Sequence, residues 1–230
     1  MWIEKDDILV VIPAWKEEDR IGAVVKGVQS EGYKNILVID DGSGDRTSEL
    51  ARRSGAKVLR HLINRGPGAA TMTGLEWAKR HGFKFVITMD GDGQHLPEDL
   101  DSFVEAMNTD EADLIIGNRF LLDSNEIPFI RKIYNRTANL FTGVLAGGSA
   151  SDSQSGFKLI GPKALDEFIL HIDGYGFCSE MIIIASRQNL KVSEIPIQVL
   201  YFDPTPGKGQ GFIEGIKTVW QLFQHKFFKQ

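Results

Sequence analysis

Two aspartates separated by one glycine, Asp90 and Asp92, are the residues of this sequence best suited to binding a metal ion. Carboxylate oxygens are the ligands that Mg²⁺ and Mn²⁺ prefer, and both cations usually keep water and substrate phosphates in their remaining positions. A cation bound there would neutralise a diphosphate leaving group. Turns rich in aspartate and glycine are also common without any function. The pair alone is weak support for a site, so its position and its neighbours must decide.

A second pair of carboxylates, Asp40 and Asp41, precedes Gly42 and Ser43. Such a carboxylate can accept hydrogen bonds from a nucleobase N–H group or from ribose hydroxyls. The alternative is a turn followed by a helix cap. Residues 64–70, Asn-Arg-Gly-Pro-Gly-Ala-Ala, form a glycine-rich helix entry whose free N–H groups would favour an anion. Close backbone packing at a turn is the equal alternative for this segment.

Arginines, histidines and a single cysteine complete the reactive side chains. Arg119 and Arg131 suit bidentate phosphate binding, although surface charge is the simpler interpretation of isolated arginines. The five histidines show no metal-ligand spacing, and only His95, beside the aspartate pair, is expected near the site. Cys178 is expected to be a small buried residue.

Alternating strands and helices would position these residues. Short apolar runs predict strands that are buried on both faces, and amphipathic stretches between them predict helices. The expected strands are residues 8–12, 35–39, 56–59, 83–89 and 113–117, and the expected helices are 18–29, 45–53, 66–80 and 97–107. This order predicts an α/β fold with a parallel sheet of right-handed βαβ units. Ligands bind outside the carboxyl ends of such strands, where both aspartate pairs stand.

The alternation weakens after Phe120. Residues 131–145 are predicted to form an amphipathic helix, residues 155–160 and 192–199 two more strands, and residues 212–228 a terminal helix.

Length and composition limit the class of protein. A chain of 230 residues fits one α/β domain, and a net charge of -5 argues against a broad basic surface for nucleic acid. One cysteine excludes an internal disulfide and fits a reducing compartment. The first residues do not resemble a signal peptide, and no apolar run approaches the roughly 18 residues of a membrane span. These features predict a cytoplasmic protein.

Taken in order, the motifs resemble family 2 glycosyltransferases with the GT-A fold, a mostly parallel Rossmann-like sheet flanked by helices. The resemblance is to the dolichyl-phosphate mannose or glucose synthase-like branch, and it covers about residues 8–197. The matching segments are Val11 to Glu18, Asp40 to Thr47, Asn64 to Ala69, Met89 to Asp99, Ile116 to Phe120 and Asp152 to Lys158. It implies a single domain over residues 1–230. Within it, residues 1–120 would bind the nucleotide sugar, 121–211 the acceptor, and 212–230 would form an amphipathic helix.

The resemblance implies roles for residues of the donor side. Pro13, Ala14 and Glu17 would line the nucleotide pocket, Asp41 would recognise the base, and Gly66 would belong to the substrate-binding set. Asp90, Asp92 and Gln94 would hold Mg²⁺ or Mn²⁺ together with the diphosphate of the donor, a GDP-mannose or UDP-glucose type of nucleotide sugar.

On the acceptor side, the resemblance implies that Arg119 and Arg131 bind donor and acceptor phosphates. Asn135 falls where the branch tends to place a small hydroxyl residue, and Glu180 matches a later acidic position. The branch also carries an arginine followed by glycine, serine and lysine near the end of the sheet. Here Lys208 stands in for the lysine and the arginine is missing.

The expected reaction is inverting transfer of a hexose, mannose or glucose, to an acceptor. A polyprenyl phosphate acceptor is ionised at neutral pH and needs no general base. A hydroxyl acceptor would need one, and Asp152 and Glu180 are the candidates. Two other classes stay open, a nucleotidyltransferase and a non-catalytic nucleotide-sugar-binding protein. The first would normally show a glycine-rich basic loop after the first strand, and the intact aspartate pair argues against the second.

A lipid acceptor would also require peripheral attachment to the cytoplasmic face of a membrane. Residues 212–228 place Phe212, Ile216, Val219, Trp220, Phe223 and Phe227 on one helical stripe with lysines nearby. Residues 130–145 show a second apolar stripe with basic residues. Bulky apolar side chains beside lysines suit a helix in the lipid interface. The alternative is that both helices simply pack on the sheet.

Overall fold

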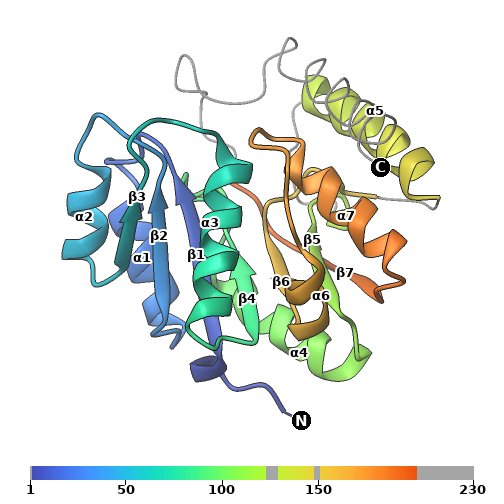
Figure 1. The fold of residues 1–230 in the computed structure, drawn as a ribbon, viewed down its shortest axis with the longest axis horizontal. Helices are drawn as coiled ribbons and strands as arrows, with labels where there is room; N and C mark the ends of the chain where they lie inside the picture. The colour runs from blue at the N-terminus through green and yellow to red at the C-terminus, as the bar shows by residue number, and fades with distance from the viewer. Residues whose placement is uncertain (1, 123–128, 148–150, 201–230) are drawn as a thin grey trace.

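The structure, a computed structural model, describes residues 2–122, 129–147 and 151–200. A seven-stranded sheet crosses the molecule in the order β3-β2-β1-β4-β6-β5-β7 (Figure 1). The strands are β1 (Ile8–Ala14), β2 (Ile36–Asp40), β3 (Lys57–Arg60), β4 (Phe85–Thr88), β5 (Leu114–Asn118), β6 (Lys158–Ile160) and β7 (Val192–Pro196). The α/β fold expected from the sequence is therefore confirmed.

The sheet is mostly parallel, as predicted. Strand β1 pairs in parallel with β2 and with β4, and β5 pairs in parallel with β7. Within the described sheet, β6 alone runs antiparallel, between β4 and β5. The carboxyl ends of β1, β2, β4 and β5 therefore lie along one edge, and β6 begins at that edge with Lys158.

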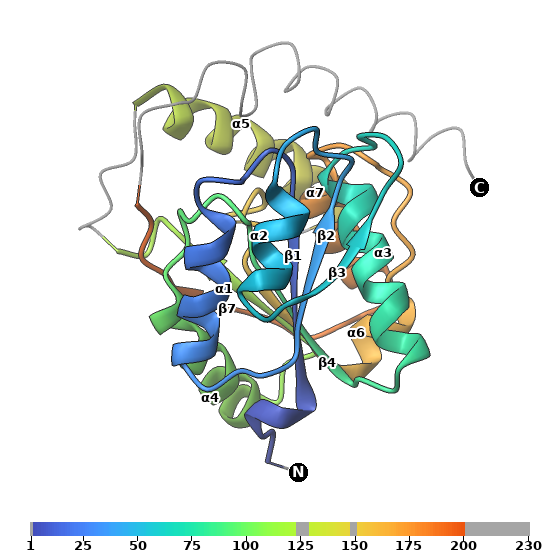
Figure 2. The ribbon, with the colours of Figure 1, turned by 90° about the vertical axis from the view of Figure 1, so that its left-hand side faces the viewer.

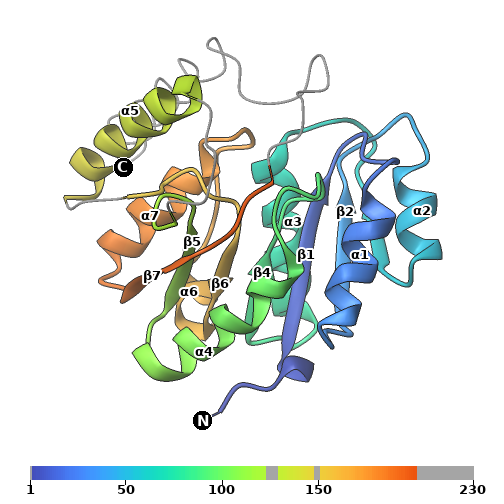
Figure 3. The same cartoon turned by 180° about the vertical axis from the view of Figure 1, so that it is seen from behind.

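Helices cover both faces of the sheet (Figures 2 and 3). The helices of the described residues are α1 (Ile21–Ser30), α2 (Thr47–Arg53), α3 (Pro67–Arg80), α4 (Leu100–Asp110), α5 (Phe129–Ala146), α6 (Pro162–Glu167) and α7 (Phe177–Arg187), with short 3-10 turns at Lys5–Asp7 and Pro97–Asp99. Of these, α5 packs on α7, beyond the carboxyl ends of the strands. Buried side chains of α1, α2 and α4 join one apolar cluster, and those of α3, α6 and α7 join the other. The sheet therefore lies between two helical layers.

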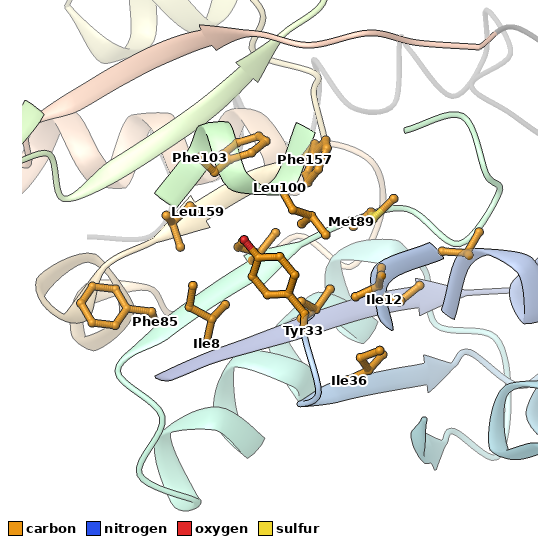
Figure 4. Packing of buried hydrophobic residues seen from close by; sticks show 14 of the residues in the cluster. Ile8, Ile12, Tyr33, Ile36, Phe85, Met89, Leu100, Phe103, Phe157 and Leu159 are labelled. Atoms are coloured by element: carbon orange, nitrogen blue, oxygen red, sulfur yellow. The ribbon is translucent and has the colours of Figure 1, made fainter. Parts of the chain in front are cut away.

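Alternation along β1 explains the two apolar clusters. Ile8 and Ile12 face the layer of α1 and α4, whereas Leu9 and Val11 face the opposite layer. Figure 4 shows the first of these clusters, in which Ile8 and Ile12 lie among side chains from several elements. Both faces of β1 are buried, as expected for the central strand of a parallel sheet.

Several element boundaries differ from the expectations. Strand β1 continues through Pro13 to Ala14, because β4 ends opposite Val11 and Pro13 pairs only with β2. The second helix begins at Thr47 rather than at Asp45, whose carboxylate accepts the Thr47 N–H at 3.0 Å. The antiparallel strand begins at Lys158, three residues later than expected. Residues 201–230, including the expected terminal helix, lie outside the described residues.

Candidate active site

The turn after β4 carries Asp90 and Asp92 at the carboxyl edge of the sheet. The Gly91 N–H donates to the Pro13 carbonyl at 3.2 Å, and a Cβ on Gly91 would lie 3.1 Å from that oxygen. Glycine therefore allows the turn to lie against the end of β1. The Asp92 Oδ1 atom accepts the backbone N–H of Gln94 at 3.0 Å, which fixes the second half of the turn. The turn thus presents both carboxylates from one fixed backbone.

The electrostatics of this turn fit a divalent cation. Partial burial raises the pKa of Asp90, 46% of whose side chain stays exposed, and the charges of Arg119 and Lys158 partly offset that increase. Burial also raises the pKa of Asp92, and the negative charge of Asp90 adds to the increase. A bound Mg²⁺ or Mn²⁺ would relieve both effects. No group of three or more His, Cys, Asp or Glu residues in the described ranges could hold a metal ion, so further ligands would be oxygens of water, of donor phosphates or of Gln94.

His95 is buried beside this turn and contacts its backbone. Its ring is 4% exposed and stacks on Phe157 with a centroid distance of 5.0 Å. Nδ1 accepts the backbone N–H of Asp90 at 3.4 Å. Burial lowers the pKa of His95 to about 4, so the ring is neutral at physiological pH. The expectation that His95 lies near the aspartate pair is confirmed, and its role there is to hold the Asp90 backbone.

The segment leading into β6 forms the wall behind Asp90. A Cβ placed on Gly156 would lie 2.6 Å from Asp90 Oδ1, so any larger residue here would displace this carboxylate from its present position. Thr88 Oγ1 donates to the Gly156 carbonyl at 2.7 Å. Lys158 is fully buried and donates its ammonium to the Ser155 carbonyl. A buried positive charge therefore stands behind the aspartate turn.

Arg119 and Asp152 form a buried ion pair next to this wall. Nε and Nη2 of Arg119 donate to the two carboxylate oxygens of Asp152 at 2.8 and 2.6 Å, and the Arg119 backbone N–H donates to Asp152 at 3.0 Å. Asp152 is fully buried and 13% of the Arg119 side chain is exposed. This bidentate geometry fixes the guanidinium. Asp152 is therefore engaged in positioning Arg119.

Glu180, the other candidate base, is also engaged. It lies in the first turn of α7 and is 3% exposed. Its carboxylate accepts the backbone N–H groups of His171, at 2.9 Å, and Ile172, at 3.0 Å. Glu180 thus anchors the loop that connects α6 to α7.

Asp41 holds the loop between β3 and α3. It is 3% exposed, and its carboxylate accepts the backbone N–H groups of Arg65, at 3.0 Å, and Gly66, at 2.7 Å. His61 Nδ1 lies 2.7 Å from Asp41 Oδ1, and His61 Nε2 lies 3.0 Å from Thr73 Oγ1. The expectation that His95 is the only histidine near the site is therefore wrong, because His61 contacts Asp41 directly. Recognition of a base by Asp41 stays a prediction.

The glycine-rich entry of α3 shows close backbone packing. The N–H groups of Gly68 and Ala69 donate to the Asp173 carbonyl at 2.8 and 3.2 Å. Gly66 has a φ of 112°, and a Cβ there would lie 2.3 Å from the same carbonyl oxygen. Of the two interpretations of this segment, close packing is the one that the structure shows. The placement of Gly66 among the substrate-binding residues stays a prediction.

The predicted nucleotide-binding residues of the first strand lie at the same edge. The Ala14 carbonyl accepts the backbone N–H of Asp41 at 2.8 Å, which joins the ends of β1 and β2. Glu17 is 8% exposed, and its backbone N–H donates to Thr47 Oγ1 at 2.8 Å. Pro13 and Ala14 therefore lie between Asp41 and the aspartate turn, and Glu17 lies beside the start of α2; that these three residues line a nucleotide pocket stays a prediction.

Helix α5 carries the remaining acceptor-side residues. Arg131 and Asn135 are both in α5, and Asn135 is 8% exposed. Asn139 Oδ1 accepts the backbone N–H of Ser153 at 2.8 Å, which ties the helix to the segment that carries Asp152. The position of the Arg131 side chain and the whole of Lys208 lie outside what the structure describes, so their roles stay predictions.

Comparison with known proteins decides the family. Residues 9–168, more than half of the chain, match the family model described as Glycosyl transferase family 2. The chain belongs to glycosyl transferase family 2.

Relatives of this glycosyltransferase include enzymes whose names refer to a polyprenyl or dolichyl phosphate. A UDP-N-acetylglucosamine–dolichyl-phosphate N-acetylglucosaminyltransferase from Methanococcus voltae is 31% identical over 96% of this chain and 97% of its own length. A polyprenol monophosphomannose synthase from Mycolicibacterium smegmatis is 30% identical over 82% of this chain and 76% of its own length. The resemblance to the polyprenyl-phosphate branch is therefore confirmed.

A solved structure shows the same fold. Glucosyl-3-phosphoglycerate synthase from Mycobacterium tuberculosis, crystallised with Mn²⁺, UDP-glucose and phosphoglyceric acid, superposes with a TM-score of 0.73. The identity is 19%, over 95% of this chain and 79% of that chain. Together with the family match, this likeness confirms the GT-A fold.

Two site residues of this glycosyltransferase were not expected from the sequence. His61 has no metal-ligand spacing, and its contact with Asp41 joins residues 20 positions apart, which no local pattern indicates. Lys158 ends the matching segment Asp152 to Lys158, but the resemblance implies no role for it. A lysine within the otherwise apolar run Phe157 to Ile160 indicates a buried charge, and buried charges are expected to have a partner.

Proposed function

We propose that this family 2 glycosyltransferase moves a hexose, with inversion, from a nucleoside diphosphate sugar to a polyprenyl phosphate. The names of the two relatives support a polyprenyl-phosphate type of acceptor, and one of them also names a UDP sugar as donor. The sugar of this enzyme would be mannose or glucose, and the donor would be of the GDP-mannose or UDP-glucose type.

The proposal depends on the observation that both candidate bases, Asp152 and Glu180, are already hydrogen-bonded to other groups of the protein. A hydroxyl acceptor has to lose its proton during attack, whereas a phosphate acceptor is already ionised. Asp152 is fully buried and bound through both oxygens to Arg119. Glu180 is buried and accepts two backbone N–H groups. Neither carboxylate is placed to take a proton from a hydroxyl, so an acceptor that needs no base is favoured.

The proposed mechanism depends on positioning and on charge. Asp90 and Asp92, with Gln94, would hold Mg²⁺ or Mn²⁺, as the Mn²⁺ in the mycobacterial structure also suggests. When bound, the cation supplies positive charge to the leaving diphosphate. Arg119, oriented by Asp152, supplies a fixed guanidinium for a phosphate group, and Arg131 would supply another. Fixed charges of this kind need no reorganisation during the reaction.

The donor nucleotide would occupy the carboxyl edge between β1 and β2. Pro13, Ala14 and Glu17 would line its pocket, and Asp41 would recognise the base. The proposed division of the chain follows the same order. Residues 1–120 would bind the donor, residues 121–211 the acceptor, and residues 212–230 would form an amphipathic helix.

The proposal places the enzyme at the cytoplasmic face of a membrane, by peripheral attachment. Helix α5 exposes the apolar side chains of Ile133, Leu140, Phe141 and Val144, between 44% and 69% each. In the described part of the chain, no helix combines the length and the apolar character needed to cross a bilayer. A helix that lies in the lipid interface needs only one such apolar face.

The donor half of the proposal is tested by thermal unfolding with a panel of GDP and UDP sugars, with and without Mn²⁺. A ligand that binds only the folded state raises its stability. We expect one donor family to raise the melting temperature, and to do so more strongly with Mn²⁺. That donor, isotopically labelled, is then incubated with a polyprenyl phosphate in detergent, and NMR gives the anomeric configuration of the product. Retention of configuration, or labelled nucleotide transferred in place of sugar, would refute the proposed reaction.

A further inference from the structure

The loop between β3 and α3 presents two large apolar side chains to solvent. Leu62 is 101% exposed and Ile63 is 69% exposed. Single exposed apolar residues are common, but two adjacent ones in one loop form a small apolar patch on the surface. The two residues are called the loop tip below.

The backbone of this tip is fixed on both sides. Before it, the His61 N–H donates to the Asp40 carbonyl at 2.9 Å, and the His61 ring contacts Asp41 at 2.7 Å. After it, Asp41 accepts the N–H groups of the next residues, 65 and 66. Gly42 packs so closely on the tip that a Cβ there would lie 2.5 Å from the Ile63 carbonyl carbon. Hydrogen bonds on both sides therefore fix the backbone of this loop, with the side chains of Leu62 and Ile63 exposed to solvent.

The tip lies at the same end of the molecule as α5. In three views about one vertical axis, the β3–α3 connection and α5 both stand beyond the carboxyl ends of the strands, opposite the N-terminus (Figures 1, 2 and 3). On α5, Ile133, Leu140 and Val144 follow one another at helical spacing and are 50%, 68% and 69% exposed. Exposed apolar groups therefore stand on both halves of the edge that carries the aspartate turn.

Basic side chains accompany both apolar groups. Lys132 and Arg136 are exposed on α5. Arg60 and Arg65 flank the loop tip, with 48% and 53% of their side chains exposed. Apolar side chains with flanking basic groups suit the interface of a bilayer that contains anionic lipids.

We propose that the loop tip inserts into the lipid interface as a second anchor beside α5. Two anchors on opposite sides of the site would orient the carboxyl edge of the sheet toward the bilayer. The inference rests on the proposed function, since a polyprenyl phosphate acceptor is presented at such a surface. It adds a specific contact from the donor half of the chain, which neither the sequence motifs nor the family assigns.

The test compares binding of the full chain to vesicles of phosphatidylcholine and phosphatidylglycerol in equal amounts. The variant Leu62→Ser/Ile63→Ser removes the apolar tip, and Leu62→Ser alone serves as a milder change in a fully exposed side chain. The control is Trp2→Ser, which removes an 80% exposed aromatic near the N-terminus, at the opposite end of the sheet. We expect at least about a tenfold fall in the partition coefficient for the double variant, a smaller fall for Leu62→Ser and no change for Trp2→Ser.

Equal vesicle binding of the folded double variant and the wild type would overturn the inference. The inference would also be overturned if the wild type formed a concentration-dependent dimer that the double variant lost, while both bound vesicles equally, because the loop tip would then be a protein interface. Transfer to polyprenyl phosphate in detergent is measured in parallel. Absence of transfer by the wild type would refute the proposed function and leave the vesicle comparison valid, whereas the double variant is expected to stay active in detergent.

Discussion

The Asp152→Asn substitution tests how this site uses its buried carboxylates. Asp152 is fully buried and accepts three hydrogen bonds from Arg119, two of them from the guanidinium. Asparagine with its oxygen in the Oδ2 position keeps the acceptor for the Arg119 backbone N–H and for Nε, but it removes the charge and places an amide N–H₂ group against Nη2. The substitution therefore keeps the size of the side chain and breaks the ion pair.

The expected cost follows from burial. Removing one partner of a buried ion pair typically costs about 3–5 kcal/mol of folding free energy, since the other charge loses its partner. Because 13% of the Arg119 side chain is exposed and the two hydrogen bonds to the Oδ2 position survive, we expect about 3 kcal/mol, the lower end of that range. A domain with about 5–15 kcal/mol of stability still folds after that loss. The guanidinium of Arg119 keeps its charge but is no longer held in one position, so we expect kcat to fall by up to about 10²–10³-fold, the usual effect of losing one such group at a reacting phosphate.

A double-mutant cycle with Arg119→Met separates positioning from base catalysis. If Asp152 acts only through Arg119, the double variant loses no more activity than Arg119→Met alone, and it is more stable than Asp152→Asn, because no unpaired charge is buried. Urea unfolding and kcat/KM over a range of pH give both quantities. Additive losses of activity, together with loss of the acidic limb of the pH profile only in variants that lack Asp152, would refute the positioning role.

Three other substitutions follow from the same contacts. Asp92→Asn should leave the metal-free protein at least as stable as the wild type at pH 7, because the raised pKa of Asp92 means that folding penalises its charged form. The same variant should lose the stabilisation by Mn²⁺ with donor, and a persisting Mn²⁺ effect in calorimetry would contradict this. Burial lowers the pKa of His95 to about 4 from its ordinary 6.5, so as pH falls through this range the unfolded chain takes up a proton before the folded protein does. The free energy of unfolding of the wild type should therefore fall by about 3 kcal/mol more than that of His95→Gln between pH 6.5 and 4. Equal pH dependence of the two proteins in urea unfolding would rule this out. His61→Phe should lower the free energy of unfolding by about 1.5–3 kcal/mol and weaken donor binding, since a buried carboxylate loses a donor; unchanged donor affinity in calorimetry would show that the loop contact has no part in binding.

The fold and the aspartate turn could be predicted from sequence because both follow from local pattern. Apolar runs mark β1, β2, β4 and β5, and the carboxylates lie at the carboxyl ends of two of them, with Asp40 ending β2 and Asp90 shortly after β4. The antiparallel direction of β6 could not be derived in this way. A strand of three residues carries no mark of direction, and its place between β4 and β5 is set by tertiary pairing.

The partners of the site carboxylates were equally beyond sequence reasoning. Asp152 follows Arg119 by 33 residues, and Glu180 meets backbone groups of a loop rather than a side chain. Both looked like candidate bases because a carboxylate near a substrate site carries no local sign of being occupied. The glycines at positions 66 and 68 were ambiguous for a similar reason, since the carbonyls that they approach belong to Asp173 and Ile172, about a hundred residues away in the sequence.

The central claim is that the acceptor is a phosphate and needs no base. The most direct measurement compares transfer of labelled sugar, with Mn²⁺ and the donor that stabilises the protein, to a polyprenyl phosphate and to the polyprenol of the same chain length. We expect rapid transfer to the phosphate and no detectable transfer to the alcohol, because Asp152 and Glu180 are both hydrogen-bonded to other groups of the protein. Comparable transfer to the alcohol, or transfer to the alcohol alone, would contradict it.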